Sequence, residues 1–183
     1  MKKALVPLAD GFEDIEAVSI IDVLRRGGVE VVTASLADGT SVLSAHGIRM
    51  DADARLSDVL EEKYDAIILP GGGEGTKNLS ECEPLLERLR RQKAEGGFVC
   101  AICAAPTVLE LAEVIEDETV TCYPSCAPEM ARPVKPVPVI ADGQIITGQG
   151  PGAATLFSLA VLSNLVDERT AHRVANGMIA EFA

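Results

Sequence analysis

The sequence predicts an α/β protein with a mostly parallel sheet, helices on both faces and a small antiparallel hairpin. Apolar runs suited to buried strands alternate along the chain with segments of helical spacing, which is the pattern of a sheet covered by helices. Glycine pairs follow two of the predicted helices and end them. With 183 residues, 48% of them hydrophobic and 3% aromatic, we expect one domain over 1–183 with an aliphatic core.

The first half of the chain supplies three strands and two helices. The first helix is expected over 14–26, because Ile15, Val18 and Ile21 fall near helical spacing and Gly27 ends the run. The turn signal Asp38-Gly39 predicts a hairpin within 40–50. The remaining elements are strands at 3–8, 30–36 and 65–69 and a short helix at 56–60.

The second half continues the alternation. Strands are expected at 98–102 and 144–147, and helices at 83–95, 107–111, 153–165 and 168–179. The segment 123–138 holds five of the ten prolines and is expected to be an irregular loop. Because parallel strands end at one edge of a sheet, we expect four segments to converge there: 10–16, 70–75, 103–106 and 148–152.

Cys103 is the strongest candidate for chemistry. An apolar strand runs directly into it, small residues follow, and Pro106 suits the first turn of a helix, which together predict a nucleophile elbow. A helix N-terminus behind the thiol favours the thiolate. The spacing Cys100-x-x-Cys103 also matches a redox dithiol, but three steps along a strand span about 10 Å, too far for a disulfide. A small buried cysteine with no chemical role is the alternative.

The run Pro70-Gly71-Gly72-Gly73-Glu74-Gly75 predicts a close approach of the backbone to another group. It lacks the Lys-Ser/Thr ending of a phosphate loop and the glycine order of a dinucleotide fold. An amide-lined pocket for an oxyanion and a plain tight turn both remain open.

Acidic residues open the first predicted helix. Glu13 and Asp14 complement the helix dipole. Glu16 could instead face the sheet edge and meet Cys103, where a protonated carboxyl would stabilise a thiolate and an ionised one would not. His46 and His172 are the two histidines, and neither is close in sequence to Cys103.

The overall composition limits the possible partners. A net charge of −12 argues against nucleic acid and anionic membrane surfaces, and no apolar stretch approaches the roughly 20 residues of a membrane helix. Five cysteines, an odd number, do not indicate a disulfide framework, so a cytoplasmic location is expected. No Cys/His cluster has metal-ligand spacing, so no metal is expected, and Cys82, Cys122 and Cys126 have no assigned role.

The chain resembles the DJ-1/ThiJ/PfpI superfamily, and most closely its DJ-1 branch, over nearly its whole length. The motifs that carry the resemblance are ADGFEDIE at 9–16, DVLRR at 22–26, LPGG at 69–72, AICAAP at 101–106 and GPG at 150–152. The resemblance implies a flavodoxin-like three-layer sandwich and a homodimer that uses the first helix.

The resemblance also implies residue roles. Cys103 would be an oxidation-prone nucleophile, Glu16 its carboxylic acid partner, and the amides of Gly72 and Ala104 an anion pocket. Further neighbours of the site are expected at Gly71, Tyr123, Pro151, Arg26 and His46, with Arg26 on the interface side. One departure concerns the strand near Val120, after which the family pattern has a histidine before a proline. Here Tyr123 precedes Pro124, and a neutral phenol is a poorer base at neutral pH.

Three functional hypotheses follow. The first is a cofactor-free, glyoxalase- or deglycase-like enzyme that uses Cys103 to convert a small aldehyde or dicarbonyl, such as methylglyoxal, to a hydroxyacid. The second is a non-enzymatic oxidative-stress sensor or chaperone that works through a sulfinate on Cys103. The third, an amidase or peptidase, is weakened by Tyr123, because that chemistry needs a Cys-His pair.

Overall fold

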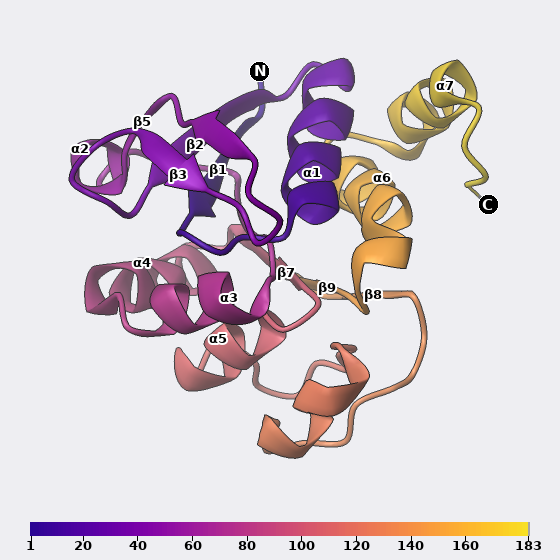
Figure 1. The fold of residues 1–183 in the computed structure, drawn as a ribbon. Coiled ribbons are helices and arrows are strands. Elements are labelled where there is room, and N and C mark those ends of the chain that lie inside the picture. Colours follow the sequence, from indigo (N-terminus) through magenta and orange to yellow (C-terminus); the bar gives the residue numbers. More distant parts are fainter. Residues whose placement is uncertain (183) are drawn as a thin grey trace.

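The computed structural model describes residues 1–182 and contains a seven-stranded sheet between two layers of helices (Figure 1). The strands lie in the order β5-β2-β1-β6-β7-β9-β8, and every pair is parallel except β8–β9. The strand bounds are β1 Lys3–Leu8, β2 Glu30–Ser35, β5 Ala54–Arg55, β6 Ala66–Leu69, β7 Phe98–Ile102, β8 Val139–Asp142 and β9 Ile145–Gly148. A separate antiparallel hairpin consists of β3 Ser41–Leu43 and β4 Arg49–Asp51.

Helices cover both faces, as the sequence predicted. One face is covered by α1 Asp14–Arg26 and α6 Ala154–Leu165, and α7 Glu168–Met178 packs against α6. The other face is covered by α2 Leu56–Val59, α3 Gly73–Ser80, α4 Glu83–Ala94 and α5 Pro106–Leu111. Within the described residues, no helix combines the length and apolar character needed to span a bilayer.

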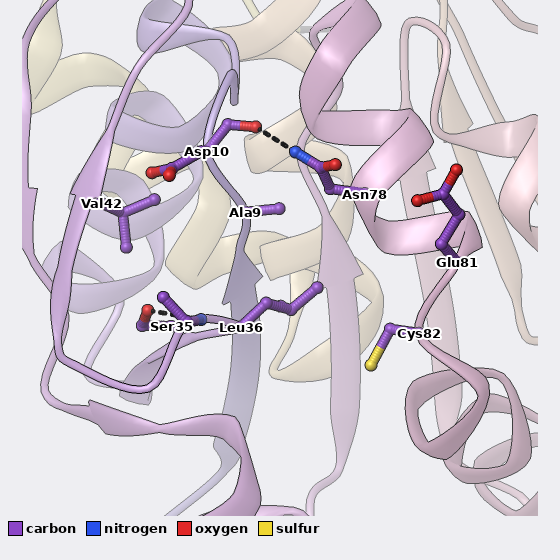
Figure 2. A pocket seen from close by; sticks show the side chains of 9 residues that line it. Ala9, Asp10, Ser35, Leu36, Val42, Asn78, Glu81 and Cys82 are labelled. Carbon is purple, nitrogen blue, oxygen red and sulfur yellow. Dashed lines mark hydrogen bonds between the residues drawn. The ribbon is translucent and has the colours of Figure 1, made fainter.

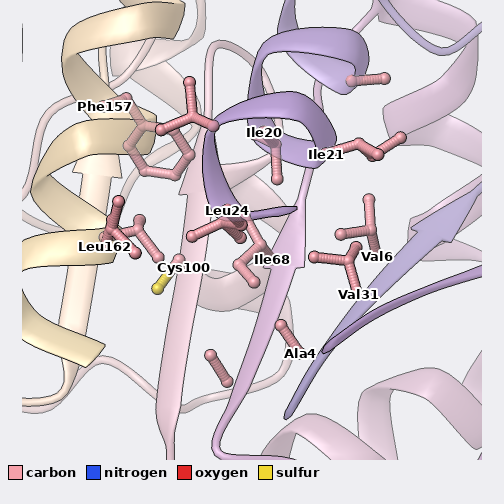
Figure 3. Close-up of a cluster of buried hydrophobic side chains, with 14 of the residues drawn as sticks. Ala4, Val6, Ile20, Ile21, Leu24, Val31, Ile68, Cys100, Phe157 and Leu162 are labelled. Atoms are coloured by element: carbon pink, nitrogen blue, oxygen red, sulfur yellow. The ribbon is translucent and has the colours of Figure 1, made fainter. Parts of the chain in front are cut away.

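The strands alternate between two hydrophobic clusters, one on each face. In β7, Cys100 and Ile102 face α1 and α6, whereas Val99 and Ala101 face the opposite layer. Figure 3 shows the first cluster, where Leu162 of α6 packs beside Cys100 and opposite α1. A methyl group on Gly27, at the end of α1, would lie 2.3 Å from Cδ1 of Leu162, so the close packing of these helices requires glycine there.

The structure differs from the sequence predictions at three places. The run after Pro70 is a turn only as far as Gly72, because helix α3 begins at Gly73; its two glycines lower helix propensity, but burial of Leu79 stabilises it. The strand expected at 144–147 is confirmed as β9, but its antiparallel partner β8 was not predicted; Gly143 makes the turn between them with a φ of 57°. The proline-rich segment contains a 3-10 helix at Pro124–Glu129.

Candidate functional site

Cys103 lies at the sharp turn between β7 and α5. Its φ is 65°, a left-handed conformation that costs a non-glycine residue about 1–2 kcal/mol. Two backbone hydrogen bonds hold the strained residue in place: its amide donates to the Gly148 carbonyl at 2.9 Å, and its carbonyl accepts from the Tyr123 amide at 2.8 Å. The strand-to-helix elbow expected from the sequence is therefore present, with the thiol largely buried.

Glu16 lies in the first turn of α1 and is fully buried. Its Oε2 accepts a hydrogen bond from the Gly71 amide at 2.8 Å. A methyl group on Gly71 would lie 2.7 Å from Cβ of Cys103 and 2.8 Å from the same Oε2, so Glu16 and Cys103 lie on either side of Gly71 at close range. Oε1 is buried and has no hydrogen-bond partner of regular geometry within residues 1–182.

Burial raises the pKa of Glu16 to about 7, although the Gly71 amide opposes the shift, and the nearby Glu13 charge adds to it. Burial and the charge of Glu16 raise the pKa of the Cys103 thiol to about 12. The backbone amides of Ala104 and Gly72, which point at the sulfur, lower it. Burial and the charge of an ionised Glu16 together outweigh these amides.

These two pKa values are coupled through one proton. A buried, unpartnered carboxylate oxygen is costly, and a proton on the Glu16 carboxyl removes this cost. The protonated carboxyl is also a hydrogen-bond donor close to Cys103. Protonation of Glu16 also removes the charge that opposes the thiolate. Ionisation of Cys103 is therefore less costly when the proton resides on Glu16, although burial still raises the pKa of the thiol.

The glycine run brings backbone amides to the sulfur. Gly72 has a φ of 96°, and a methyl group on it would lie 2.2 Å from the Gly11 carbonyl oxygen. This conformation and this contact both require glycine. The segments 10–16, 70–75, 103–106 and 148–152 meet at the carboxyl edge of the sheet, as the sequence predicted.

His46 lies on the rim, on the loop between β3 and β4. Its Nδ1 is 2.6 Å from Oδ2 of Asp14, and the pKa of His46 is raised by this hydrogen bond. Ser44 donates to the other Asp14 oxygen. The ligand atoms of Glu13, Asp14 and His46 lie within 4.8 Å of one another, an arrangement that sequence analysis missed because His46 is far from the other two in sequence.

Tyr123 and Pro151 lie together on the other side of the elbow, where both line a hollow described below. Arg26 lies away from Glu16 and Cys103 within one chain, and its expected place on the interface side stays a prediction. It pairs with Asp22 at 2.7 Å at the exposed end of α1, about 15 Å along the helix from Glu16.

The other cysteines are free thiols. Cys100 is buried in β7, and burial raises its pKa. Cys82 lines a separate hollow with Asp10, Leu36 and Asn78, beyond the ends of β1 and β2 (Figure 2). In that hollow the Asn78 amide donates to the Asp10 carbonyl at 2.9 Å.

The fold and the site together define a flavodoxin-like α/β protein with a strained cysteine at the elbow and a buried carboxyl beside it. The chain belongs to the DJ-1/PfpI family, whose model matches residues 2–164. Its relatives lie in the DJ-1 branch.

Protein dj-1beta of Drosophila melanogaster is 36% identical over 184 residues, which cover 99% of this chain and 98% of that protein. Protein DJ-1 homolog B of Arabidopsis thaliana is 38% identical over 97% of this chain, which spans only 41% of the plant protein. Among solved structures, oxidized DJ-1 of Toxoplasma gondii has a TM-score of 0.96 at 35% identity, with both chains covered in full.

Proposed function

We propose that this protein converts small α-oxoaldehydes to hydroxyacids, with Cys103 as nucleophile, Glu16 as proton carrier and no cofactor. The observation that carries the proposal is the Glu16 carboxyl, whose pKa is raised to about 7 beside the thiol, so that it can both give and take a proton near neutral pH. A Caenorhabditis elegans relative, 39% identical over 90% of this chain, is named a glutathione-independent glyoxalase.

The reaction begins with attack of the Cys103 thiolate on the aldehyde carbon. A carbon–sulfur bond forms, and the aldehyde oxygen becomes an oxyanion that the Gly72 and Ala104 amides stabilise. The proton held by Glu16 then neutralises that oxygen and gives a hemithioacetal. The two amides are already aimed at the sulfur, so the oxyanion forms next to donors that need no rearrangement.

The ionised Glu16 then removes the hydrogen of the former aldehyde carbon as a proton, leaving an enediolate whose charge lies on the former ketone oxygen. The same carboxyl returns this proton to the neighbouring carbon, and the hydroxyl proton on the sulfur-bearing carbon moves to the neighbouring oxygen. The neighbouring carbon thus becomes an alcohol, and the sulfur-bearing carbon becomes a thioester. Water cleaves the thioester, releases the hydroxyacid and restores the Cys103 thiol. One carbon is oxidised and its neighbour reduced, so methylglyoxal plus water gives lactate with no external oxidant or reductant.

The test is lactate formation by chelator-treated protein in methylglyoxal. Wild type should form many equivalents of lactate per chain, whereas Cys103→Ser and Glu16→Gln should form almost none. Cys82→Ser, which removes a thiol from the separate hollow, serves as the matched control and should keep wild-type activity. Absence of lactate from wild type at high protein concentration contradicts the proposal.

A second candidate function, oxidation sensing at Cys103, is supported by the unpartnered Oε1 of Glu16. A protonated Oε1 would donate to a sulfinate oxygen, and the Gly72 and Ala104 amides would hold its charge. The test is mass spectrometry after mild peroxide treatment. Two oxygens should appear on Cys103 before Cys82, Cys122 or Cys126 react, and uniform oxidation of all four refutes selective sensing.

We also propose a homodimer formed through α1. Ile15 and Val18 of this helix are 57% and 50% exposed, and Ile48 on the adjacent hairpin is 57% exposed. Burial of these apolar side chains against a second copy would stabilise the pair. Val18→Asp should shift the sedimentation coefficient from dimer to monomer, and an unchanged coefficient contradicts this interface.

A further inference from the structure

A hollow of about 330 Å³ opens beside the elbow, and we call it the Tyr123 pocket. Its walls come from the two ends of the proline-rich segment and from the turn that leads into α6. The lining residues are Tyr123, Pro124, Pro138, Gln149, Gly150, Pro151, Gly152 and Ala153. No side chain in this lining carries a charge.

The segments that form the pocket walls are hydrogen-bonded to the backbone of Cys103. The Tyr123 amide donates to the Cys103 carbonyl at 2.8 Å, and the Cys103 amide donates to the carbonyl of Gly148, which leads into the other wall. Both walls of the Tyr123 pocket therefore lie within one residue of a backbone hydrogen bond to Cys103, which places the hollow beside the elbow. The Glu16 side of the elbow is closed by Gly71 and buried side chains.

The walls of the pocket suit a flat apolar group. The Tyr123 ring lies against Gly150, where a methyl group would come within 3.2 Å of ring atom Cδ2, so the glycine makes room for the ring. The Tyr123 side chain is 45% exposed, and its ring is open to contact by a ligand. Aromatic rings that stack on one another gain affinity beyond the burial of their surface.

We propose that the Tyr123 pocket binds the substituent on the ketone carbon of the substrate and that it favours an aromatic ring over a methyl group. This inference rests on the proposed function and names the substrate class: aryl α-oxoaldehydes. A cavity of roughly 150 Å³ suffices for benzene in a protein interior. A methyl group leaves most of the 330 Å³ hollow unfilled, whereas a phenyl group occupies much of it and contacts Tyr123.

The kinetic test compares phenylglyoxal, which would give mandelate, with methylglyoxal, which would give lactate. Wild type should have the higher kcat/KM for phenylglyoxal. Tyr123→Ala should lower the ratio of the two kcat/KM values about 2- to 10-fold, the equivalent of one aromatic contact. Tyr123→Phe keeps the ring and should keep the ratio. Leu111→Ala, an exposed position on α5 outside the pocket, is the control.

A binding test separates this inference from the proposed activity. The chain has two tyrosines and no tryptophan, so in Tyr64→Phe the intrinsic fluorescence comes from Tyr123 alone. Mandelate should quench it saturably, and lactate at the same concentration should not. Quenching by mandelate in a protein that turns over neither aldehyde supports the pocket and refutes the activity.

Two results overturn the inference. One is an equal loss of both activities in Tyr123→Ala, which leaves the ratio unchanged and shows that the ring does not select the substituent. The other is fluorescence that mandelate and lactate affect alike, which shows that the pocket does not distinguish an aromatic group from a methyl group.

Discussion

The raised pKa of Glu16 makes the stability of the protein depend on pH in a defined window. The pKa of the carboxyl rises from 4.5 to about 7 on folding. At about 1.36 kcal/mol per pKa unit, the buried carboxylate opposes folding by up to about 3 kcal/mol when fully ionised. Because the Glu16 carboxyl is coupled to the Cys103 thiol, we expect its opposition to folding to be about 2–3 kcal/mol.

The sign follows from proton counting. Between about pH 4.5 and about pH 7 the folded state holds the Glu16 proton and the unfolded state has lost it, so stability falls as the pH rises. Below about pH 4.5 Glu16 is protonated in both states, and its carboxyl no longer opposes folding. Carboxylates with a lowered pKa, such as Asp53 and Glu118, act at lower pH and in the opposite direction.

The perturbation is Glu16→Gln, which keeps the size and an oxygen for the Gly71 amide but cannot ionise. Urea unfolding at about pH 5 and about pH 8 gives the free energy of unfolding of each protein. Stability of wild type relative to Glu16→Gln should fall by about 2–3 kcal/mol between these two values. The raised pKa of His46 also lowers stability as the pH rises, but His46 is common to both proteins and cancels.

The exposed Glu87 provides the matched control. Glu87→Gln should differ from wild type by a constant amount across the same range. A constant difference between wild type and Glu16→Gln, within about 0.5 kcal/mol, would refute the reasoning that Glu16 is buried with its proton.

Three further changes test the elbow and the core. Cys103→Gly should abolish reactivity yet stabilise the protein by about 1 kcal/mol in urea unfolding, because glycine relieves the strain of a φ of 65°. Lower stability of this variant would show that the Cys103 side chain contributes more than the strain costs. Gly72→Ala should lower the free energy of unfolding by more than about 2 kcal/mol or prevent folding, because the new methyl group clashes with the Gly11 carbonyl oxygen. Wild-type stability of this variant in the same assay would contradict the prediction. Phe157→Ala should lower the free energy of unfolding by about 3–5 kcal/mol, because the ring is fully buried in the core cluster. A loss under about 1 kcal/mol would mean that neighbouring side chains fill the space left by the ring.

Helices and strands with a clear apolar periodicity and clear end signals were predictable from the sequence. Helix α1 and strand β1 have the expected bounds, because Gly27 marks the end of the helix and the apolar run from Lys3 is short and unbroken. Helix α3 was not predicted, because Gly73 and Gly75 are poor helix formers. The close approach of Gly75 to Phe12 explains the glycine, and this contact is invisible in the sequence.

The site was predictable where neighbours in sequence are neighbours in space. The elbow at Cys103 could be found from local pattern, and Glu16 was placed near it from the first turn of a helix at the sheet edge. The contact of His46 with Asp14 joins residues 32 positions apart, and the contact of Tyr123 with Gly150 joins a loop to a distant turn. Such pairs depend on tertiary packing, for which the local pattern holds no signal.

The central claim is that Glu16 holds the proton when Cys103 is a thiolate. The most direct test is to measure the alkylation rate of Cys103 in wild type, Glu16→Gln and Glu16→Leu. Mass spectrometry at neutral pH would assign the modification to Cys103 rather than to the other four thiols. A donor beside the sulfur stabilises the thiolate, so wild type and the Gln variant should react at least about tenfold faster than the Leu variant. A Leu variant that reacts as fast as wild type or faster would show that Glu16 acts only as a repelling charge, and would contradict the claim.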